Sequence, residues 1–339
     1  MDTKLFHTDD NEIAEAGEIL RNGGLVAFPT ETVYGLGASA FDSDAAKKIY
    51  AAKGRPSDNP LIVHLCDKGQ IKDIAEEIPE SAKKVIDNFM PGPVTIILKK
   101  KSVVPNDVTA GLDTVAIRFP LHETAQKLIK AAGVPIAAPS ANLSGKPSPT
   151  KAKHVVKDMT GRIDAIIDGG ECNVGVESTI VDFTGEKPVI LRPGGVTYDD
   201  LKGIGLDVEI DKNILHSIAA DEVPKCPGMK YKHYAPNAEV TVVEGEKDAV
   251  QSKIKELLEQ TEGKVTGVLT MYGAVYDKAV MLSAGSTNKE YAKNLFAALR
   301  EFDELGVEVV FAEFSEKDGY GLAVKNRLYK AAAQRVIHV

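Results

Sequence analysis

The stretch VPIAAPSANLSGKPSPT, residues 134–150, joins two patterns that decide the fold class of this chain. Residues 134–138 form a short apolar run typical of a buried strand. Apolar residues recur at helical spacing over residues 151–159, and Ser148 followed by Pro149 resembles an N-cap with proline at the first helical position. A strand, a hydroxyl-rich loop and a helix N-terminus together expose backbone N–H groups that bind anions. The pattern predicts a phosphate site, although taken alone this segment would more simply be an ordinary strand-to-helix loop.

Length and composition place the chain among globular proteins with more than one domain. Its 339 residues exceed what one core commonly contains, and 43% hydrophobic with 27% charged residues is an ordinary balance. The three cysteines form no CxxC pair, which argues against a disulfide framework or a zinc ribbon. Residues 1–7 show neither the basic start nor the apolar run expected of a signal peptide, and no apolar run in the sequence approaches membrane-spanning length. We expect a cytoplasmic protein with no membrane contact.

The charge of the chain argues against non-specific binding to nucleic acid. The net charge is −8, from 41 Lys and Arg against 49 Asp and Glu. Residues 1–205 carry 24 basic and 28 acidic side chains, and residues 206–339 carry 17 and 21. Neither half is basic, so any site for a polyanion must be local.

Strand-like and helix-like segments alternate along the first 205 residues, which predicts an α/β fold with one large twisted mixed sheet covered by helices. The predicted strands are 25–28, 60–65, 94–98, 114–119, 134–138, 163–168, 178–183 and 189–191, and the predicted helices are 11–22, 44–53, 81–89, 122–132 and 151–159.

The remainder divides into a linker and a second domain. Residues 206–237 lack a clear period, yet they are richer in Tyr, His and Met than linkers usually are. We therefore expect an ordered segment lying over a site as a lid. Residues 238–339 alternate again, with a predicted helix over 321–336, which indicates a smaller, Rossmann-like α/β domain with parallel strands.

Polar or basic side chains occur where several predicted strands and helices end. They lie in the segments 29–37, 53–60, 116–120, 177–179 and 191–195. Because ligands of open α/β sheets bind beyond strand ends, these segments are expected to meet in one crevice.

Simpler interpretations exist for several of these residues. Lys53 and Arg55 would stabilise a helix C-terminus without any ligand, and His64 in an apolar strand is more often a core residue than a ligand contact. Arg118 in an apolar strand is different, because a buried guanidinium requires a carboxylate or phosphate partner. Motifs of P-loop nucleotidases, zinc proteases and serine hydrolases are absent from the sequence. Cations, hydroxyls and backbone N–H groups suit positioning and charge neutralisation rather than covalent catalysis.

Eight motifs in one order resemble the two-domain form of the threonylcarbamoyl-AMP synthase family, which pairs a YrdC-like catalytic domain with a small C-terminal α/β domain. They are PTETVYGLG at 29–37, KGRPSDNPL at 53–61, PGPVT at 91–95, AIRFP at 116–120, PSANLSGKPSPT at 139–150, ESTIVDF at 177–183, LRPGG at 191–195 and PGMKYKHYAP at 227–236. The resemblance implies a YrdC-like domain over 1–205, the linker or lid over 206–237 and the C-terminal domain over 238–339.

The resemblance also implies the reaction. L-threonine, bicarbonate or CO₂, and ATP give threonylcarbamoyl-adenylate and pyrophosphate, and a tRNA-modifying transferase complex then uses the adenylate to modify adenosine 37 of tRNA. The enzyme would be a nucleotidyltransferase that acts with Mg²⁺ carried by the ATP phosphates and with no metal site of its own. It would be a monomer, with no stable binding of nucleic acid.

Site residues are carried over from the resemblance position by position. Lys53 and Arg55 would be catalytic; Thr32, His64, Arg118, Ala138 and Ser178 would bind threonine; Arg55, Asn59, Thr114, Ser140, Ser148, Arg192 and Tyr231 would bind ATP. Two other functions remain open from sequence. One is a protein that binds double-stranded RNA or tRNA by recognising its shape. The other is a related carbamoyl transferase, although the acylphosphatase-like and zinc-finger segments of such proteins are missing.

Overall fold

The computed structural model describes residues 2–215, 224–227, 233–261, 263–271, 273–316 and 318–339. Its contacts divide the chain into two compact units. The first comprises residues 1–144 and 148–230, and the second comprises residues 145–147 and 231–339. We call them the N-terminal and the C-terminal unit. The C-terminal unit therefore includes three residues from within the SANLSGKPSPT segment.

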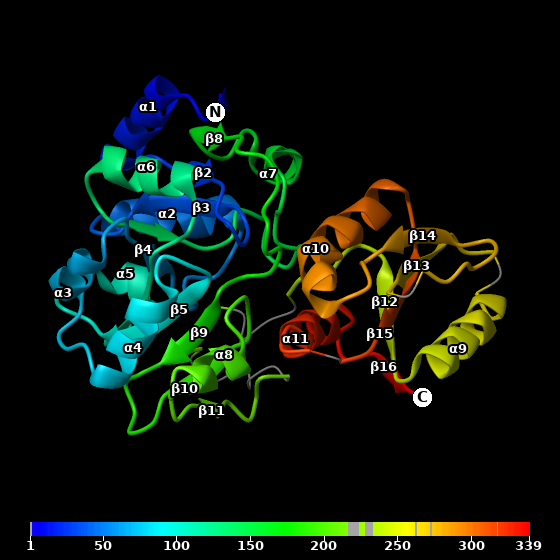
Figure 1. Ribbon diagram of the computed structural model, residues 1–339. Coiled ribbons are helices and arrows are strands. Elements are labelled where there is room, and N and C mark those ends of the chain that lie inside the picture. The colour runs from blue at the N-terminus through cyan, green and yellow to red at the C-terminus, as the bar shows by residue number, and fades with distance from the viewer. Residues whose placement is uncertain (1, 216–223, 228–232, 262, 272, 317) are drawn as a thin grey trace. The chain divides into compact units, whose positions relative to one another are not determined.

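The N-terminal unit is built on one mixed sheet of eleven strands (Figure 1). In spatial order they are β1 (Lys4–Phe6), β8 (Ala165–Ile167), β2 (Val26–Phe28), β3 (Gly35–Ser39), β7 (Ile136–Ala138), β4 (Ile62–His64), β6 (Thr114–Arg118), β5 (Val94–Lys99), β9 (Thr179–Asp182), β10 (Val189–Arg192) and β11 (Glu209–Ile210). Parallel and antiparallel neighbours both occur, so the predicted large mixed sheet is confirmed.

Helices connect these strands. They are α1 (Asp10–Arg21), α2 (Ser43–Lys53), the 3₁₀ turn η1 (Lys68–Gln70), α3 (Ile71–Ile74), α4 (Glu80–Phe89), α5 (Asn106–Thr109), α6 (Glu123–Ala132), α7 (Ala152–Met159) and α8 (Tyr198–Gly203). Helices α1 and α6 pack together beside β2 and β3 (Figure 1), and their apolar faces form one core cluster with Phe28, Ile136 and Ala138.

The strand register fixes which side chains share a face of this sheet, because cross-strand partners point the same way. His64 pairs with Arg118 and with Ile136, and Arg118 pairs in turn with Thr95. One step back along each strand, Ile62 pairs with Ala116 and Ala138. These side chains therefore point to the face that α1 and α6 cover over β2, β3 and β7.

The C-terminal unit contains a five-stranded sheet in the order β14 (Val280–Ser283), β13 (Thr266–Thr270), β15 (Val309–Phe314), β12 (Glu239–Glu244) and β16 (Val336–His338). Its helices are α9 (Lys247–Glu259), α10 (Asn288–Glu304) and α11 (Gly321–Ala331). Every strand pairing in this sheet is parallel, as predicted.

Sequence analysis missed some elements. Strand β3 occupies part of the segment 29–37 that we expected to be a loop, and its two glycines are the reason. A Cβ atom on Gly37 would come within 2.8 Å of Ile136 and 2.9 Å of Phe28, so glycine lets the neighbouring strands pack closely. The helix predicted over 321–336 ends at Ala331 and is followed by β16. Strands β1 and β11 were not predicted.

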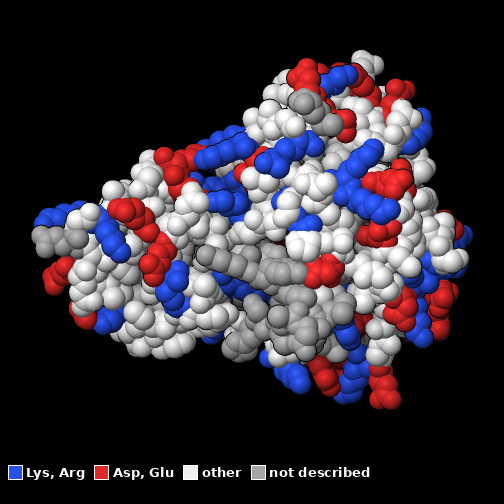
Figure 2. Space-filling view, turned by 180° about the vertical axis from the view of Figure 1, so that it is seen from behind, with Lys and Arg blue, Asp and Glu red and all other residues white. Residues whose placement is uncertain are grey.

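Acidic and basic side chains are interspersed over the face of the molecule in Figure 2. Among the described residues, no helix is both long and apolar enough to cross a membrane.

Candidate functional site

The predicted site residues of the N-terminal unit do not share one edge of the sheet. His64 and Arg118 lie at the carboxyl ends of β4 and β6, but β7 runs antiparallel to β4, so Ala138 lies beside Ile62 at the opposite end. Of the segments expected to meet in one crevice, 116–120, 177–179 and 191–195 lie together at the Arg118 edge, and Glu31 of the segment 29–37 lies 2.8 Å from Arg118. The crevice itself stays a prediction, and Ala138 does not lie at that edge. The register instead places these side chains on one face of the sheet, spread along the direction of the strands.

Arg118 is the last residue of β6, on this face of the sheet, and is buried, with 4% of its surface exposed. Its Nη2 is 2.8 Å from Oε1 of Glu31, which is equally enclosed. Neither Glu31 oxygen makes a hydrogen bond within the described structure, and the same holds for Nε and Nη2 of Arg118, because the pair is close but poorly aligned. The guanidinium keeps donors available for a carboxylate or phosphate ligand.

His64 is held neutral beside Arg118. Burial, assisted by the Arg118 charge, lowers its pKa to about 3, and its Nδ1 lies 2.9 Å from the carbonyl oxygen of Ile62. A neutral imidazole adds no second positive charge to this part of the face. Thr32 is fully buried, and its hydroxyl lies 2.9 Å from that of Thr30.

Ser178 and Arg192 form one buried hydrogen-bonded group. Arg192 donates from Nε to the Ser178 carbonyl oxygen at 3.0 Å and from Nη2 to its hydroxyl at 3.1 Å. The Ser178 hydroxyl also lies 2.7 Å from that of Thr95. Gly194 allows this approach, since a Cβ there would meet the Glu177 carbonyl oxygen at 2.4 Å.

Lys53 holds the loop that follows β7. Its Nζ donates to the carbonyl oxygens of Ser140 and of Asn142, the latter at 2.7 Å, and the side chain is only 3% exposed. Ser140 in turn donates from its hydroxyl to Oδ1 of Asn142 at 2.5 Å. The lysine at the end of α2 thus fixes the loop's conformation and brings its positive charge to it.

The proposed helix N-cap at Ser148 is wrong. Helix α7 begins at Ala152 with Lys151 as its N-cap, and Lys151 makes no side-chain capping bond. Ser148 is buried and donates from its hydroxyl to Oε1 of Glu177 at 2.5 Å. Ser148 is therefore tied to the segment that precedes β9 rather than to α7.

The other predicted nucleotide contacts are Arg55 and Asn59, which follow α2 in the chain, and Thr114, at the start of β6. Arg55 donates from Nη2 to the Asn59 carbonyl oxygen at 3.1 Å. Asn59 is fully buried, and neither atom of its side-chain amide has a hydrogen-bond partner among the described residues. Thr114 starts β6, four residues before Arg118, which is about 13 Å along a strand. Tyr231 lies outside the described residues.

Part of the linker covers this same face. Cys226 is fully buried in a cluster with Ile62, Ala116 and Ile180, whose side chains point to the face of Arg118. The next residue, Pro227, accepts a hydrogen bond from Nη1 of Arg192 at 3.4 Å. Residues 224–227 therefore lie against the sheet within the N-terminal unit.

Four participating residues escaped the sequence-based prediction: Glu31, Thr95, Asn142 and Glu177. Each stands inside a motif that sequence analysis singled out, so the motifs were the available signal. Most of their partners could not be read from spacing, because the contacts with Arg118, Ser178, Lys53 and Ser148 join segments far apart in the chain.

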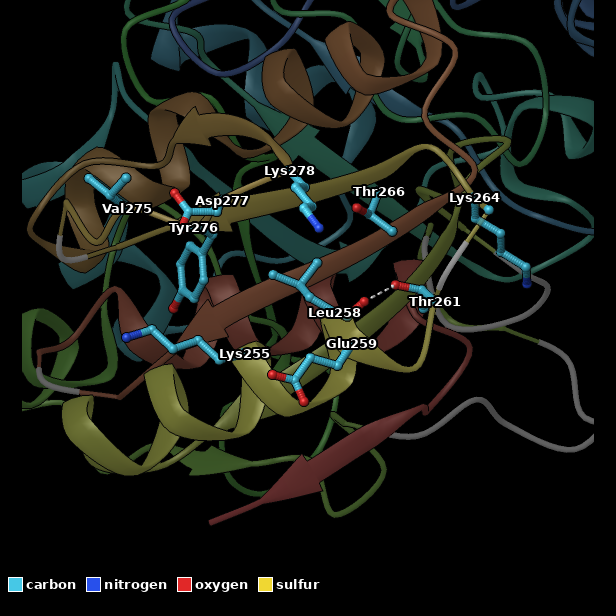
Figure 3. Close-up of a pocket in the computed structure, with 11 residues that line it drawn as sticks. Lys255, Leu258, Glu259, Thr261, Lys264, Thr266, Val275, Tyr276, Asp277 and Lys278 are labelled. Atoms are coloured by element: carbon cyan, nitrogen blue, oxygen red, sulfur yellow. Dashed lines mark hydrogen bonds between the residues drawn. The ribbon is translucent and has the colours of Figure 1, made fainter.

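A separate pocket lies in the C-terminal unit and contains none of the predicted site residues. Its volume is about 780 Å³, and Lys255, Leu258, Thr266, Tyr276 and Lys278 are among the residues that line it (Figure 3). Among the described residues of both units, no group of three or more His, Cys, Asp or Glu side chains is placed to hold a metal ion.

These features define an α/β protein with a large mixed sheet, one face of which carries buried arginines, hydroxyls and a loop held by Lys53, groups suited to a small anionic ligand. Residues 18–194 match the Sua5/YciO/YrdC family model, described as "Telomere recombination", and residues 196–333 match the model "Threonylcarbamoyl-AMP synthase, C-terminal domain". The chain belongs to the Sua5/YciO/YrdC family, in its two-domain form.

Full-length relatives support the same assignment. A protein of Pyrococcus abyssi is 51% identical over 97% of this chain and 96% of its own length, and one of Bacillus subtilis is 49% identical over 99% and 97%. Both are named threonylcarbamoyl-AMP synthase. The structure of P. abyssi Sua5 complexed with L-threonine matches with a TM-score of 0.95 and 49% identity, covering 100% of both chains. The predicted family and fold class are confirmed.

Proposed function

We propose that this protein is a nucleotidyltransferase that makes threonylcarbamoyl-adenylate from L-threonine, bicarbonate or CO₂, and ATP, and releases pyrophosphate. The observation that carries the proposal is the buried Arg118, whose Nε and Nη2 lack hydrogen-bond partners among the described residues, together with the loop held by Lys53. Both full-length relatives named above carry the name of this activity.

The threonine end of the site is assigned to the Arg118 end of the sheet face. Arg118 would bind the α-carboxylate with its fork of N–H donors. Neutral His64, Ser178, Thr32 and the Ala138 backbone would surround the rest of the amino acid. A small polar substrate fits this lining, because hydroxyls and backbone groups select by hydrogen bonding.

The nucleotide end is assigned to the loop held by Lys53 and to residues near it. Ser140, Ser148 and Asn59 would bind ATP together with Arg55, Arg192, Thr114 and Tyr231. The carbamate oxygen formed on threonine attacks the α-phosphorus of ATP, and pyrophosphate leaves. Arg55 and Arg192 would stabilise the charge that grows on the phosphate oxygens. Lys53 acts with them as a positioning residue, because its ammonium group fixes the loop carbonyls.

Mg²⁺ fits this site as an ion carried by the nucleotide. The described residues offer no cluster of carboxylates for an all-protein cage, and Mg²⁺ commonly binds through substrate phosphates and water. Bound in that way, it would neutralise charge on the triphosphate.

We also propose that the linker, residues 206–237, acts as a lid that keeps water from the adenylate. Cys226→Asp should test this, because a carboxylate cannot remain between Ile62 and Ala116 unpaired. We expect a lower yield of adenylate per pyrophosphate released, while Lys212→Ala, at an exposed linker residue, leaves the yield unchanged. An unchanged yield in Cys226→Asp would remove the support for a lid.

The first test of the activity is pyrophosphate release from ATP by the purified full-length protein. Release should require both L-threonine and bicarbonate, and serine should substitute poorly. Release that is independent of threonine, or no release at all, would contradict the proposal. A protein that binds RNA by shape would then become the leading alternative, and its tRNA binding should weaken steeply with salt.

The remaining features of the proposal concern partners and location. The adenylate would pass to a transferase complex that modifies adenosine 37 of tRNA, and this protein would work as a monomer in the cytoplasm. Sedimentation of the pure protein tests the monomer, and fractionation of its native cells tests the location.

A further inference from the structure

Glu31 is a buried charged group that the proposed mechanism leaves without a role. It is 6% exposed, and its carboxylate lies 2.8 Å from Nη2 of Arg118 without the alignment of a hydrogen bond. Neither oxygen has a hydrogen-bond partner among the described residues. A carboxylate that is enclosed in this way is costly, so the structure retains a free-energy penalty that a suitable ligand could relieve.

The main chain, not the carboxylate, holds this residue in place. The Glu31 carbonyl oxygen accepts from the backbone N–H of Val174 at 2.8 Å, and that of Thr32 accepts from Gly175 at 3.1 Å. The Thr30 hydroxyl donates to the Val33 carbonyl oxygen at 2.6 Å. The local fold is therefore secured without any hydrogen bond from the Glu31 side chain.

Glu31 and Arg118 present a negative and a positive group side by side, both with unused hydrogen-bonding capacity. Neighbouring His122 adds no charge, because burial lowers the pKa of its imidazole, and His64 is neutral. An α-amino acid carries its ammonium and its carboxylate on one carbon atom. The pair is therefore complementary to the zwitterionic head of an amino acid, with each ligand charge meeting its opposite.

We propose that Glu31 binds the α-ammonium group of the amino-acid substrate while Arg118 binds its carboxylate. Glu31 is thus a specificity-determining residue that selects amino acids over carboxylic acids of the same shape. The inference rests on the proposed function, since it takes L-threonine as the substrate. It adds a role for the acidic residue of the PTETVYGLG motif, which the nucleotide and threonine assignments had not used.

Binding of two ligands to the full-length protein tests this assignment without any turnover. L-threonine and (R)-3-hydroxybutanoate, which is threonine without its amine, are titrated calorimetrically in the absence of ATP and bicarbonate. The wild type should bind threonine more tightly by a factor on the order of 10 to 100, as expected for a hydrogen bond between charged groups.

Glu31→Gln is the matched variant, because it keeps the size of the side chain and removes its charge. The preference for threonine should fall to near unity, and (R)-3-hydroxybutanoate should bind at least as well as to the wild type. If Glu31 served only to orient Arg118, both ligands would weaken by the same factor and the preference would persist. That result would overturn the proposal. Arg118→Ala, as a control, should weaken both ligands.

Two further outcomes separate this inference from the proposed function. Equal binding of the two ligands by the wild type would overturn the role of Glu31 even if the variant failed to fold, and would leave threonine as a ligand. A wild type that binds no threonine would instead contradict the proposed function itself, and the inference with it. Glu31→Asp, which keeps the charge, should retain a preference for threonine.

Discussion

Glu31 in the N-terminal unit and Glu313 in the C-terminal unit are both buried carboxylates, but their surroundings differ. Glu313, at 0% exposure on β15, accepts from the Tyr276 hydroxyl at 2.5 Å and from the Met271 backbone N–H at 2.7 Å. Glu31 has only the misaligned charge of Arg118 beside it among the described residues. Glu313 is hydrogen-bonded to donors of its own unit. Glu31 has no such donor among the described residues, so its carboxylate remains available to a ligand.

The buried arginines show the same contrast. Arg300 of the C-terminal unit donates from Nε and Nη2 to the Pro147 carbonyl oxygen at 3.1 and 2.6 Å. Arg118 leaves Nε and Nη2 without hydrogen-bond partners in the described part of the chain. Burial of charge is therefore common to both units and does not mark a site. A buried charged group that lacks hydrogen-bond partners does mark a candidate site, because folding alone would not favour leaving such a group unpaired.

The largest effect is expected at Arg118. Arg118→Ala should raise the KM for threonine on the order of 100-fold, since it removes a charged, buried contact to the carboxylate. The KM for ATP should stay close to that of the wild type. Steady-state kinetics with each substrate varied in turn gives both values. Equal increases in the two constants would mean that Arg118 is structural or serves the phosphates, and would erase the contrast with Arg300.

Glu313→Ala, in contrast, should lower the stability of the protein and leave its substrate affinity unchanged. It leaves the Tyr276 hydroxyl and the Met271 N–H without their acceptor, so we expect a loss of about 2–4 kcal/mol in the free energy of unfolding. Urea denaturation measures the loss, and threonine affinity should not change. Glu316→Ala, at an exposed carboxylate, is the control and should stay within about 0.5 kcal/mol. A weakened threonine affinity in Glu313→Ala would contradict the distinction between the two carboxylates.

The smallest effect concerns His64 and acid stability. Its folded pKa of about 3 lies below the ordinary value of 6.5, so only the unfolded chain takes up this proton as the pH falls below 6.5. Stability should therefore decline between pH 6.5 and 5, with His64 contributing about 2 kcal/mol of the loss. Urea midpoints at the two pH values should differ less in His64→Gln. The same decline in wild type and variant would show that His64 is not held neutral.

The sequence predicted much of the fold because strand and helix periods are local signals. Strand β3 was missed because Gly35 and Gly37 resemble turn residues, although they serve close packing against Phe28. The helix predicted over 321–336 was too long because its true end carries no residue type that signals a helix C-terminus. Ala333 and Gln334 end it in the left-handed region, at φ 49° and 66°, and neither residue type signals such a conformation.

The sequence motifs predicted which segments form the site, but they did not predict which side chains contact each other. The motifs contain most of the residues assigned to the sheet face, although His64, Thr114 and Ala138 lie outside them. The antiparallel register of β7 against β4 decides where Ala138 and Ser140 lie. Ser148 looked like an N-cap because Pro149 follows it, yet its partner is Glu177, which lies 29 positions away. Such long-range contacts depend on tertiary structure, which spacing along the chain does not encode.

The burial of two of the three thiols determines which cysteine of this protein reacts first with oxidants and alkylating reagents. Cys172 is 3% exposed, and burial raises its pKa to about 12, so almost none of it is thiolate at neutral pH. Cys226 is fully enclosed by the sheet face. Cys66 is only partly buried, and iodoacetamide or peroxide should reach it first. A thiol-directed probe would therefore label the native protein at Cys66, two residues beyond the end of β4, and labelling of Cys226 would report directly on movement of residues 224–227.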